Sequence, residues 1–501
     1  MRTVIRGGWV VAYASGSHTL VRDGIVIVED DRVHAIATAY DGTADLEIDA
    51  RGKLVSPGFI DTHVHPGIRA THRLIADTGR QVLMGQVFLE HTLTKPGRRT
   101  PSDLRYDEAP TSRTVPDDFG ALFTQAELLR NGITTFIDYD ARVSYQEQEA
   151  AVAEKLGLRA YLGPGFQSSI LEGTENGHWR RERIDARGRE EFAAALNFIR
   201  RFDGAANGRI RGLLAPRETD FCDAEMLRAT RAAADELKVP IEIHAAYNPM
   251  EFHTIVEEYG CTPIEYLAHT GLLGRDLILG HCNFVAENPL TNWQEGHDLE
   301  LIAAAGAVVS YSPINIIRRG RSLDFDRYRK AGVIMALGTD TYPRDLIMNM
   351  RVASYVAKVQ SRSVFAGSAA ELFTAATIGG ARALNREDLG RLAPDAKADI
   401  TIVRLRAADS LRWGVVHDPI KALVDTGCGD DVDTVLVDGV VRMRDRKIPG
   451  VDFGDLLDRA QAYAGQYWTH LQEWDLLGRS AEQACPWAFP LSDPGPVVEA
   501  V

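Results

Sequence analysis

Cysteine is scarce in this chain of 501 residues, and the few copies are scattered. The five cysteines have no C-x-x-C spacing and stand at Cys222, Cys261, Cys282, Cys428 and Cys485. Disulfide frameworks and structural zinc knuckles are built from paired cysteines, so an odd and dispersed set argues against both. The sequence therefore predicts a fold held by its hydrophobic core, in a reducing compartment such as the cytoplasm.

Long hydrophobic runs and an excess of basic charge are also missing. No stretch reaches the roughly 18 apolar residues of a membrane helix, and two arginines interrupt the first eight residues, so no signal peptide is expected. The net charge is −14 and is spread along the chain. Phosphate binding needs a basic face, so nucleic acid is an unlikely partner on physical grounds. We expect a small-molecule partner, with neither membrane nor nucleic acid.

What the sequence does contain is a change of pattern along the chain. Both ends carry short β-branched segments separated by polar turns, whereas apolar strands alternate with helical stretches from about residue 56 to 390. This alternation is typical of parallel β/α units. The eight candidate strands are residues 54–61, 133–139, 159–163, 210–215, 240–245, 277–282, 307–312 and 334–340.

These patterns predict an α/β protein with a (β/α)8 barrel of the TIM type over residues 56–390. Residues 1–55 and 391–450 are expected to form a small β-sandwich module from both chain ends. Residues 451–501 should form a helical C-terminal tail that packs on the body. The long intervals 66–120 and 164–190 follow strands one and three, where a barrel keeps its active-site loops.

The sharpest local pattern is a pair of histidines, His63 and His65, at the end of the first barrel strand. Side chains at i and i+2 of a strand project to the same side, so both imidazoles can reach one ion. The pair alone is weak, but His244, His281 and Asp340 end three further apolar runs. Imidazoles with one carboxylate suit zinc, with iron, manganese or cobalt as alternatives. The sequence therefore predicts one divalent-metal site at the carboxyl end of the barrel.

The motifs around these residues resemble the amidohydrolase superfamily, in the branch of cytosine and guanine deaminases and triazine hydrolases (chlorohydrolases). The resemblance covers nearly the whole chain. It rests on PGFIDTHVH at 57–65, GITT at 132–135, GHC at 280–282, SPIN at 312–315, LGTD at 337–340 and VLVDG at 435–439. It implies that His63, His65, His244 and Asp340 hold the metal, and that His281 binds the metal or contacts the substrate. It also implies a homo-oligomer, a dimer or a tetramer.

The sequence departs from that branch at two strand ends. No lysine stands near the end of strand four, where two-metal relatives carry one, so a single metal is favoured. Family deaminases usually have a proton-shuttling glutamate in a His-x-x-Glu motif, but His244 is followed here by Ala245, Ala246 and Tyr247. We expect Tyr247 either to donate a proton or only to line the pocket. The remaining candidate substrate-binding residues near the strand ends are Asn248, Asn315 and Arg217.

Two carboxylates are candidates for the missing proton carrier. Glu242 stands two residues before His244 on the same strand, so its side chain should also point into the barrel, one layer below the metal. The alternative is a buried carboxylate bonded to a histidine or to backbone. Glu218 stands at a strand end, although its neighbour Arg217 could simply neutralise it. A basic cluster, Arg318-Arg319-Gly320-Arg321, follows strand seven and would either attract an anionic substrate or form a solvated loop.

The resemblance implies a hydrolase that attacks its substrate with a metal-activated water. Asp340 would accept the proton of that water, and His281 would stabilise the charge that develops on the substrate. Our leading hypothesis is cleavage of a non-peptide C–N bond in a small cyclic or aryl-substituted molecule. The alternative is deamination or dechlorination of a purine-, pyrimidine- or triazine-like ring. A non-catalytic scaffold on the same fold is a remote third reading, because the chain keeps all five candidate ligands.

Overall fold

The computed structural model describes residues 1–65, 67, 118–174, 179–286, 288–293, 295–406 and 411–491. Most of the predicted loop at 66–120 lies outside these residues. The chain divides into two compact units, which are described separately. The first comprises Met1–Gly67, Asp118–Ile170 and Arg183–Asp452 and holds every candidate site residue.

Parallel strands in the first unit form the barrel that the alternating pattern predicts. One sheet has the order β11-β8-β7-β6, with β12 also pairing β8, and another has the order β13-β14-β15-β16. Parallel bridges between Leu214 and Ile241 and between Val64 and Asp340 join the two sheets at both edges. The predicted TIM-type α/β fold is confirmed. The barrel strands are β6 (Phe59–Val64), β7 (Ile133–Ala141), β8 (Arg159–Phe166), β11 (Ile210–Gly212), β12 (Ala215–Pro216), β13 (Ile241–Ala245), β14 (Leu277–His281), β15 (Val308–Tyr311) and β16 (Ile334–Leu337).

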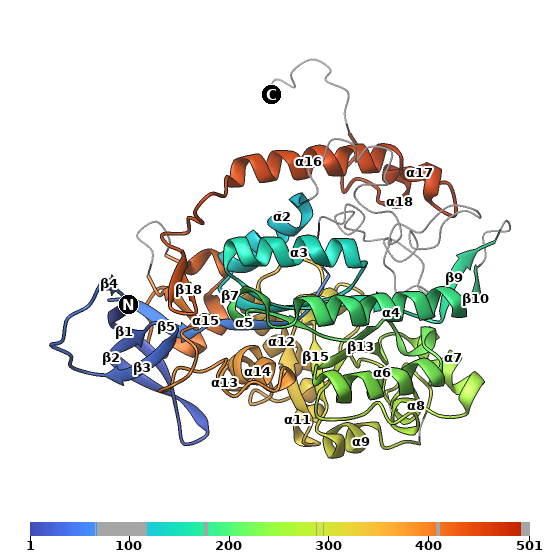
Figure 1. The fold of residues 1–501 in the computed structure, drawn as a ribbon, viewed down its shortest axis with the longest axis horizontal. Coiled ribbons are helices and arrows are strands. Elements are labelled where there is room, and N and C mark those ends of the chain that lie inside the picture. The colour runs from blue at the N-terminus through green and yellow to red at the C-terminus, as the bar shows by residue number, and fades with distance from the viewer. Residues whose placement is uncertain are drawn as a thin grey trace, which may run out of the picture. The chain divides into compact units, whose positions relative to one another are not determined.

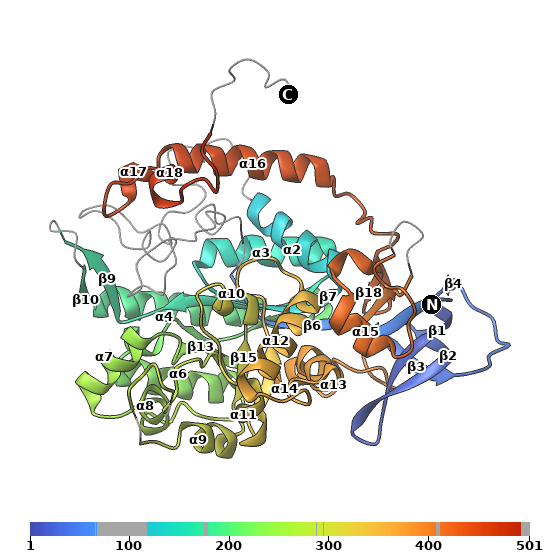
Figure 2. The ribbon, with the colours of Figure 1, turned by 180° about the vertical axis from the view of Figure 1, so that it is seen from behind.

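Helices lie around the outside of these strands (Figures 1 and 2). The longer ones are α2 (Phe119–Arg130), α3 (Val143–Leu156), α4 (Asp185–Phe202), α6 (Ala224–Leu237), α7 (Pro249–Tyr259), α9 (Asp298–Ala305), α12 (Leu346–Ser361) and α15 (Pro419–Thr426). The shorter ones are α5 (Ala205–Gly208), α8 (Pro263–His269), α10 (Pro313–Ile317), α11 (Phe325–Lys330), α13 (Ala369–Thr374) and α14 (Gly380–Ala383).

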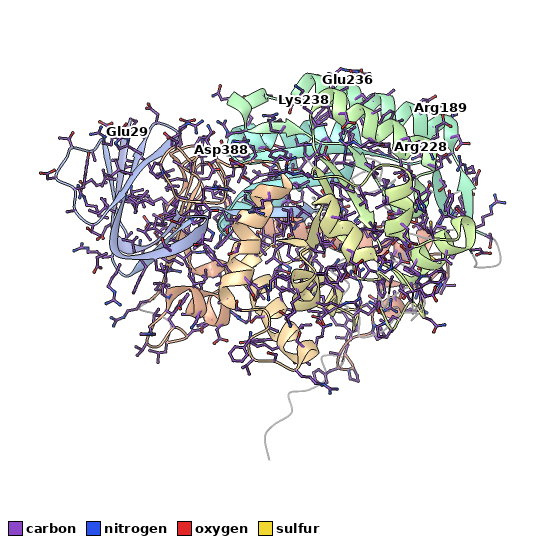
Figure 3. The ribbon with its side chains drawn as sticks, turned by 90° about the horizontal axis from the view of Figure 1, so that it is seen from below. Glu29, Arg189, Arg228, Glu236, Lys238 and Asp388 are labelled. Atoms are coloured by element: carbon purple, nitrogen blue, oxygen red, sulfur yellow. The ribbon has the colours of Figure 1, made fainter. Side chains whose placement is uncertain are left out.

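Helix α6 illustrates why the sequence forms such a layer. Asp223 caps its first turn by accepting a hydrogen bond from the backbone N–H of Met226 at 2.9 Å. Its buried residues, Met226, Leu227, Thr230 and Ala234, recur at helical spacing. Its exposed charged residues Arg228 and Glu236 lie on the outer surface, as does Arg189 of α4 (Figure 3). The apolar side therefore faces the strands and the charged side faces water.

Strands from both chain ends share one eight-stranded sheet beside the barrel. Its order is β19-β18-β17-β5-β1-β2-β3, and β4 pairs with β1. The strands are β1 (Arg2–Ala14), β2 (Ser17–Glu29), β3 (Arg32–Ala37), β4 (Leu46–Asp49), β5 (Lys53–Pro57), β17 (Ile400–Arg404), β18 (Val432–Val437) and β19 (Val440–Met443). The sheet thus contains segments from both of the predicted end regions. The two-layer sandwich and the boundaries of the module stay predictions.

The first predicted barrel strand is in fact divided between two sheets. The strand expected at 54–61 is wrong: β5 belongs to the end sheet, and the barrel strand β6 begins only at Phe59. The chain crosses between the sheets at Gly58, where a Cβ atom would lie 2.1 Å from Oγ1 of Thr134.

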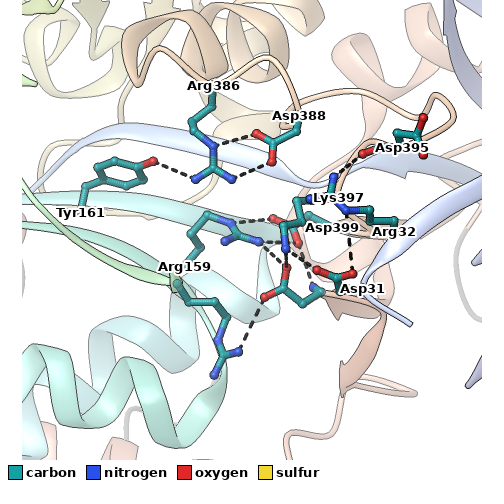
Figure 4. Close-up of polar contacts among 11 residues, drawn as sticks. Asp31, Arg32, Arg159, Tyr161, Arg386, Asp388, Asp395, Lys397 and Asp399 are labelled. Carbon is teal, nitrogen blue, oxygen red and sulfur yellow. Dashed lines mark hydrogen bonds and ion pairs between the residues drawn. The ribbon is translucent and has the colours of Figure 1, made fainter. Parts of the chain in front are cut away.

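Buried ion pairs connect the amino end of the barrel to the end sheet (Figure 4). Arg159 opens β8 and is 1% exposed. Its guanidinium lies 3.1 Å from Asp399 and 2.7 Å from Asp438. Lys397 adds a second cation 3.3 Å from Asp438. This end of a TIM barrel is the one that serves stability.

The described part of the second unit includes the C-terminal tail. The described part of the tail contains α16 (Phe453–Thr469), α17 (Leu471–Trp474) and α18 (Ala481–Ala484). The packing of this tail on the body stays a prediction. In the described ranges, no helix combines the length and apolar character that crossing a membrane requires.

Candidate metal centre

Five buried side chains gather where the barrel strands end. The Nε2 atoms of His65 and His244 are 3.1 Å apart. The carboxylate of Asp340 lies 3.7 Å from Nε2 of His65 and 3.5 Å from Nε2 of His281. Candidate ligand atoms of His63, His244 and His281 all lie within 4.8 Å of one another, as do those of His63, His65 and Asp340. The structure thus brings together all five residues that the sequence singled out.

Glu242 fixes the orientation of His63 from below. Its Oε1 lies 2.5 Å from Nδ1 of His63, and both side chains are fully buried. A carboxylate accepts, so Nδ1 carries the proton and Nε2 offers its lone pair to the cluster. Burial raises the pKa of Glu242 to about 7. Burial also opposes charging of His63, but Glu242 and the nearby aspartates raise the pKa of His63 overall.

His244 is oriented in the same way by Tyr139 of β7 and by Arg217, which directly follows β12. Its Nδ1 lies 3.0 Å from the carbonyl oxygen of Arg217 and also contacts the hydroxyl of Tyr139. A carbonyl can only accept, so Nδ1 is the protonated nitrogen and Nε2 points toward His65. Burial lowers the pKa values of both His244 and His281 well below 6.5. Both rings are therefore neutral, which is the form that binds metals.

The backbone at two of these residues adopts an uncommon conformation. His281 has φ +75° and Asp340 has φ +61°, the left-handed region that non-glycine residues seldom occupy. Such strain persists where the surroundings enforce it and is concentrated at functional sites. Gly338 makes room for the arrangement, because a Cβ there would lie 2.6 Å from Cβ of His63. The sequence signal at these two residues is a nearby glycine, Gly280 before His281 and Gly338 before Asp340.

Residues that sequence reasoning missed hold Asp340 and the closing strands in place. Asp61 is fully buried and accepts hydrogen bonds from the Thr339 hydroxyl at 2.6 Å and its backbone N–H at 3.0 Å. This ties β6 to the end of β16, and burial raises the pKa of Asp61 to about 6.

Asn315 donates from Nδ2 to Oδ2 of Asp340. The predicted candidate Asn315 therefore lies against the carboxylate of the cluster.

Glu218 and Tyr247 lie together beside His244. The backbone of Glu218 forms a parallel β-bridge with that of His244 on the next strand. Paired residues of neighbouring strands project to the same face, so the two side chains lie on the same side. The hydroxyl of Tyr247 donates to Oε2 of Glu218 at 3.0 Å, and its ring centroid is 5.8 Å from that of His244. Burial and Glu218 raise the pKa of Tyr247 well above 10. A carboxylate from strand four thus adjoins the position where the family motif carries a glutamate.

The remaining predicted residues have structural contacts as well. Asn248 is buried and caps α7, because its Oδ1 accepts from the backbone N–H of Glu251 at 2.8 Å. Arg217 contributes its carbonyl oxygen to His244, and its side chain is half-buried. The basic cluster divides: Arg318 is exposed, whereas Arg319 lies 3.5 Å from Oδ1 of Asn315. The substrate-binding roles of Tyr247, Asn248, Asn315 and Arg217 stay predictions.

The donor set fits a metal ion. Nε2 of His63 is fully buried and has no hydrogen-bond partner among the described residues. A buried nitrogen without a partner costs about 1–3 kcal/mol, so such an atom needs a ligand. The Nε2 atoms of His65 and His244 face each other at 3.1 Å. The carboxylate of Asp340 completes the set of donors. Several imidazoles with one carboxylate suit a divalent transition metal.

A parallel barrel with histidines and an aspartate at its strand ends defines a class of metal-dependent hydrolases. The model of the Amidohydrolase family matches residues 54–442 of this sequence. The chain belongs to the amidohydrolase family. It is an enzyme that hydrolyses C–N bonds other than peptide bonds.

Curated relatives match almost from end to end. The chain is 29% identical over 456 residues to a 5'-deoxyadenosine deaminase of Methanothermobacter thermautotrophicus, covering 89% of this chain and 95% of the relative. It is 30% identical over 474 residues to a 5-methylthioadenosine/S-adenosylhomocysteine deaminase of Desulforudis audaxviator, covering 93% and 98%.

Solved structures share the fold. An adenosine deaminase from Xanthomonas campestris with bound zinc has a TM-score of 0.75 at 22% identity, covering 93% of this chain and 98% of that one. An atrazine chlorohydrolase from Arthrobacter aurescens, in complex with zinc, has a TM-score of 0.75 at 23% identity, covering 92% and 100%.

Proposed function

We propose that the enzyme hydrolyses an exocyclic C–N bond of a nitrogen heterocycle and releases ammonia or an amine while the ring is retained. The observation that carries this proposal is the pair of Glu218 and Tyr247 beside His244. Ring deamination needs a group that delivers a proton to the leaving nitrogen. Glu218 supplies a carboxylate next to the position of the absent His-x-x-Glu glutamate. The deaminase names of the curated relatives support the same reaction class.

We assign the binding of one divalent metal ion, preferably zinc, to His63, His65, His244 and Asp340. Strand four ends without a lysine, which favours a single ion, and the zinc in the structural relatives supports this choice of metal. When bound, such an ion lowers the pKa of water from about 15.7 toward 7. His281 stands at the edge of the set and is shared between metal and substrate.

The protein's own groups then divide the proton transfers between them. Asn315 donates to Oδ2 of Asp340 and so orients this carboxylate to accept a proton from the attacking water. His281 stabilises the negative charge that develops on the ring. Glu218, held by the Tyr247 hydroxyl, delivers a proton to the leaving nitrogen. One C–O bond forms, one C–N bond breaks, and the amine leaves neutral.

Hydrolysis of an amide, urea or carbamate is the second candidate. It is favoured by one observation, the tyrosine at position 247 in place of the family glutamate. Ring dechlorination is a third outcome of the same chemistry. The products separate them: a retained ring plus ammonia or amine, a carboxylate or carbon dioxide plus amine, or chloride. A dimer or tetramer and a cytoplasmic location are part of the same proposal.

The test combines a substrate panel with one matched pair of variants. Amino-substituted purines, pyrimidines and triazines are screened for ammonia release, and the best substrate is used for Glu218→Gln. We expect kcat to fall about 10²- to 10⁴-fold, because general acid–base groups contribute that much, with bound zinc unchanged. Glu225→Gln, at an exposed position of α6, is the control and should retain full activity.

Two results would overturn the proposal. One is a product in which the ring is opened or a carboxylate is formed. The other is a Glu218→Gln enzyme with wild-type kcat. Tyr247→Phe separates the roles of the pair. Loss of the hydrogen bond to Glu218 should shift the alkaline limb of the pH profile of kcat, where Glu218 loses the proton that it donates, with only a small loss of maximal rate.

A further inference from the structure

Helix α7 begins directly after Tyr247, and its first turn differs from that of two other helices. Asn248 caps the helix, and Glu251 stands at the third helical position. In the usual capping box, a glutamate at this position returns to the backbone N–H of the capping residue. Glu251 instead reaches past Asn248. Its Oε1 accepts a hydrogen bond from the backbone N–H of Ala246 at 2.8 Å, and its Oε2 accepts one from that of Tyr247 at 2.6 Å.

Helices α8 and α13 show the usual arrangement. The backbone N–H of Thr262 donates to Oε2 of Glu265 at 2.8 Å in α8. That of Ser368 donates to Oε2 of Glu371 at 2.9 Å in α13. Both of these glutamates are half-buried, whereas Glu251 is fully buried. The same residue type at the same helical position therefore binds the preceding loop in α7 and the helix's own cap in the other two.

The loop that Glu251 binds has an uncommon backbone. Ala246 has φ +47°, in the left-handed region that non-glycine residues seldom occupy. Successive N–H groups next to such a residue form a concave site for an anion, and the carboxyl group of Glu251 fills it. Burial raises the pKa of Glu251 well above 4.5, whereas the two backbone N–H groups act in the opposite direction. These hydrogen bonds therefore offset part of the cost of burying an acid here.

Tyr247 is consequently held at two points. Its backbone N–H donates to Glu251, and its hydroxyl donates to Oε2 of Glu218 at 3.0 Å. A tyrosine side chain has only two rotatable bonds, so the place of its hydroxyl depends closely on the place of its backbone. A displacement of the backbone at Tyr247 therefore moves the hydroxyl relative to Glu218.

We propose that Glu251 is a positioning residue, which fixes the backbone of Tyr247 so that the tyrosine hydroxyl holds Glu218 in place for proton delivery. The carboxyl group that is missing at position 247 is thereby replaced by an arrangement of three residues. Glu218 delivers the proton, Tyr247 orients Glu218, and Glu251 orients Tyr247. This inference rests on the proposed function, which makes Glu218 the proton donor.

The first measurement follows Tyr247 directly and needs no turnover. Zinc-loaded full-length enzyme labelled with 3-fluorotyrosine is studied by fluorine NMR, and the resonance that disappears in Tyr247→Phe is assigned to Tyr247. Glu251→Gln keeps the size of the side chain but has a single acceptor oxygen, so one of the two backbone N–H groups loses its partner. We expect the resonance of Tyr247 to shift or broaden in Glu251→Gln.

Glu265→Gln is the matched control, because it removes a carboxylate from the same position of α8. It should leave the resonance of Tyr247 and kcat unchanged, although it also weakens a helix cap. Circular dichroism and thermal unfolding check that each variant is folded. If Glu251→Gln does not fold, Glu251→Asp takes its place, since its carboxyl group is one methylene shorter and should shift the same resonance.

The second measurement is a double-mutant cycle in kcat. Glu251→Gln and Tyr247→Phe should each lower kcat about two- to tenfold, the range expected for one net hydrogen bond, with KM within about twofold. Because Glu251 acts through the tyrosine, the double variant should be no slower than the slower single variant. Two independent roles would instead multiply the two losses.

Three results would overturn the inference. They are an unchanged resonance of Tyr247 in Glu251→Gln, losses that multiply in the double variant, and the same effects in Glu265→Gln, which would assign them to helix capping in general. Failure of the proposed function is distinguishable. It would show as a ring-opened product or as wild-type kcat in Glu218→Gln, and it would leave the fluorine resonance unaffected.

Discussion

The two ends of the barrel both bury charged side chains, but they treat them in opposite ways. At the amino end, Arg159 meets two aspartates at 3.1 and 2.7 Å, so cation and anions satisfy one another. At the carboxyl end, His63 keeps a buried Nε2 without a hydrogen-bond partner among the described residues. His281 and Asp340 also adopt left-handed backbone.

The difference shows which cluster is complete without an outside ligand. A buried ion pair with matched charges needs nothing further, and removing one partner leaves an uncompensated charge. An unpartnered buried nitrogen and left-handed backbone each cost about 1–3 kcal/mol, which the protein sustains where a ligand or a reaction needs them. The amino end therefore supports stability, and the carboxyl end is built for a metal and a substrate.

The largest expected effect comes from removing a candidate ligand at the carboxyl end. His63→Ala together with Asp340→Asn should lower kcat/KM about 10³-fold or more, because metal retention and the water's proton acceptor are both lost. Turnover is measured alongside zinc content by mass spectrometry. Substantial turnover in this double variant would remove the basis for the mechanism.

The corresponding experiment at the amino end of the barrel removes a buried cation. Arg159→Met should lower the free energy of unfolding by about 3–5 kcal/mol, since Asp399 and Asp438 lose their buried cation. The kcat of the molecules that remain folded should be unchanged. Urea unfolding gives the first quantity and active-site titration the second. Arg189→Met, exposed on α4, should change the free energy by no more than about 0.5 kcal/mol. Lost kcat without lost stability would contradict the division between the two ends.

A smaller effect is expected at Glu242, which supports the histidine cluster without belonging to its donor set. Glu242→Gln should weaken zinc binding about 10- to 100-fold, the usual result of removing a carboxylate that orients a metal-binding histidine. Competition with a chelator measures this affinity. Glu154→Gln, at an exposed position of α3, should leave it unchanged. An unaltered zinc affinity in Glu242→Gln would reduce the carboxylate to a packing role.

The residues of the metal centre could be predicted from the sequence because the carboxyl ends of all barrel strands meet at one face of the barrel. His63, His65, His244, His281 and Asp340 each end an apolar run, so the fold alone brings them together. The inward direction of Glu242 followed from strand parity for the same reason. The cap formed by Asn248 also had a local signal, the Asn-x-x-Glu spacing to Glu251, which we interpreted as a substrate contact.

Contacts that depend on how one strand is set against another were not predictable. Tyr139 reaches His244 across strands separated by 105 positions in the sequence. The division at Gly58 depends on the closeness of Thr134, which no local pattern reveals. The hydrogen bond from Tyr247 to Glu218 likewise joins two loops whose spacing only the folded chain determines.

The last prediction concerns a buried acid that belongs to neither end. Glu149 on α3 is fully buried and accepts a hydrogen bond from Nε2 of Gln125 at 2.7 Å. Burial raises the pKa of Glu149 to about 7 from 4.5. Between these values the folded state holds a proton that the unfolded state has released, so this contribution to stability is present below pH 4.5 and is lost as the pH rises toward 7.

Glu149→Gln removes the titration and keeps the shape of the side chain. The stability of the wild type relative to this variant should therefore decline by about 1–2 kcal/mol between pH 5 and pH 7. Urea unfolding at both pH values measures the difference, and Glu154→Gln on the same helix should run parallel to the wild type. If the Glu149→Gln curve also runs parallel, Glu149 is charged and balanced in the folded protein, as the aspartates around Arg159 are. If it diverges as expected, burial without a matched cation has a pH-dependent cost that the ion pairs at the amino end avoid.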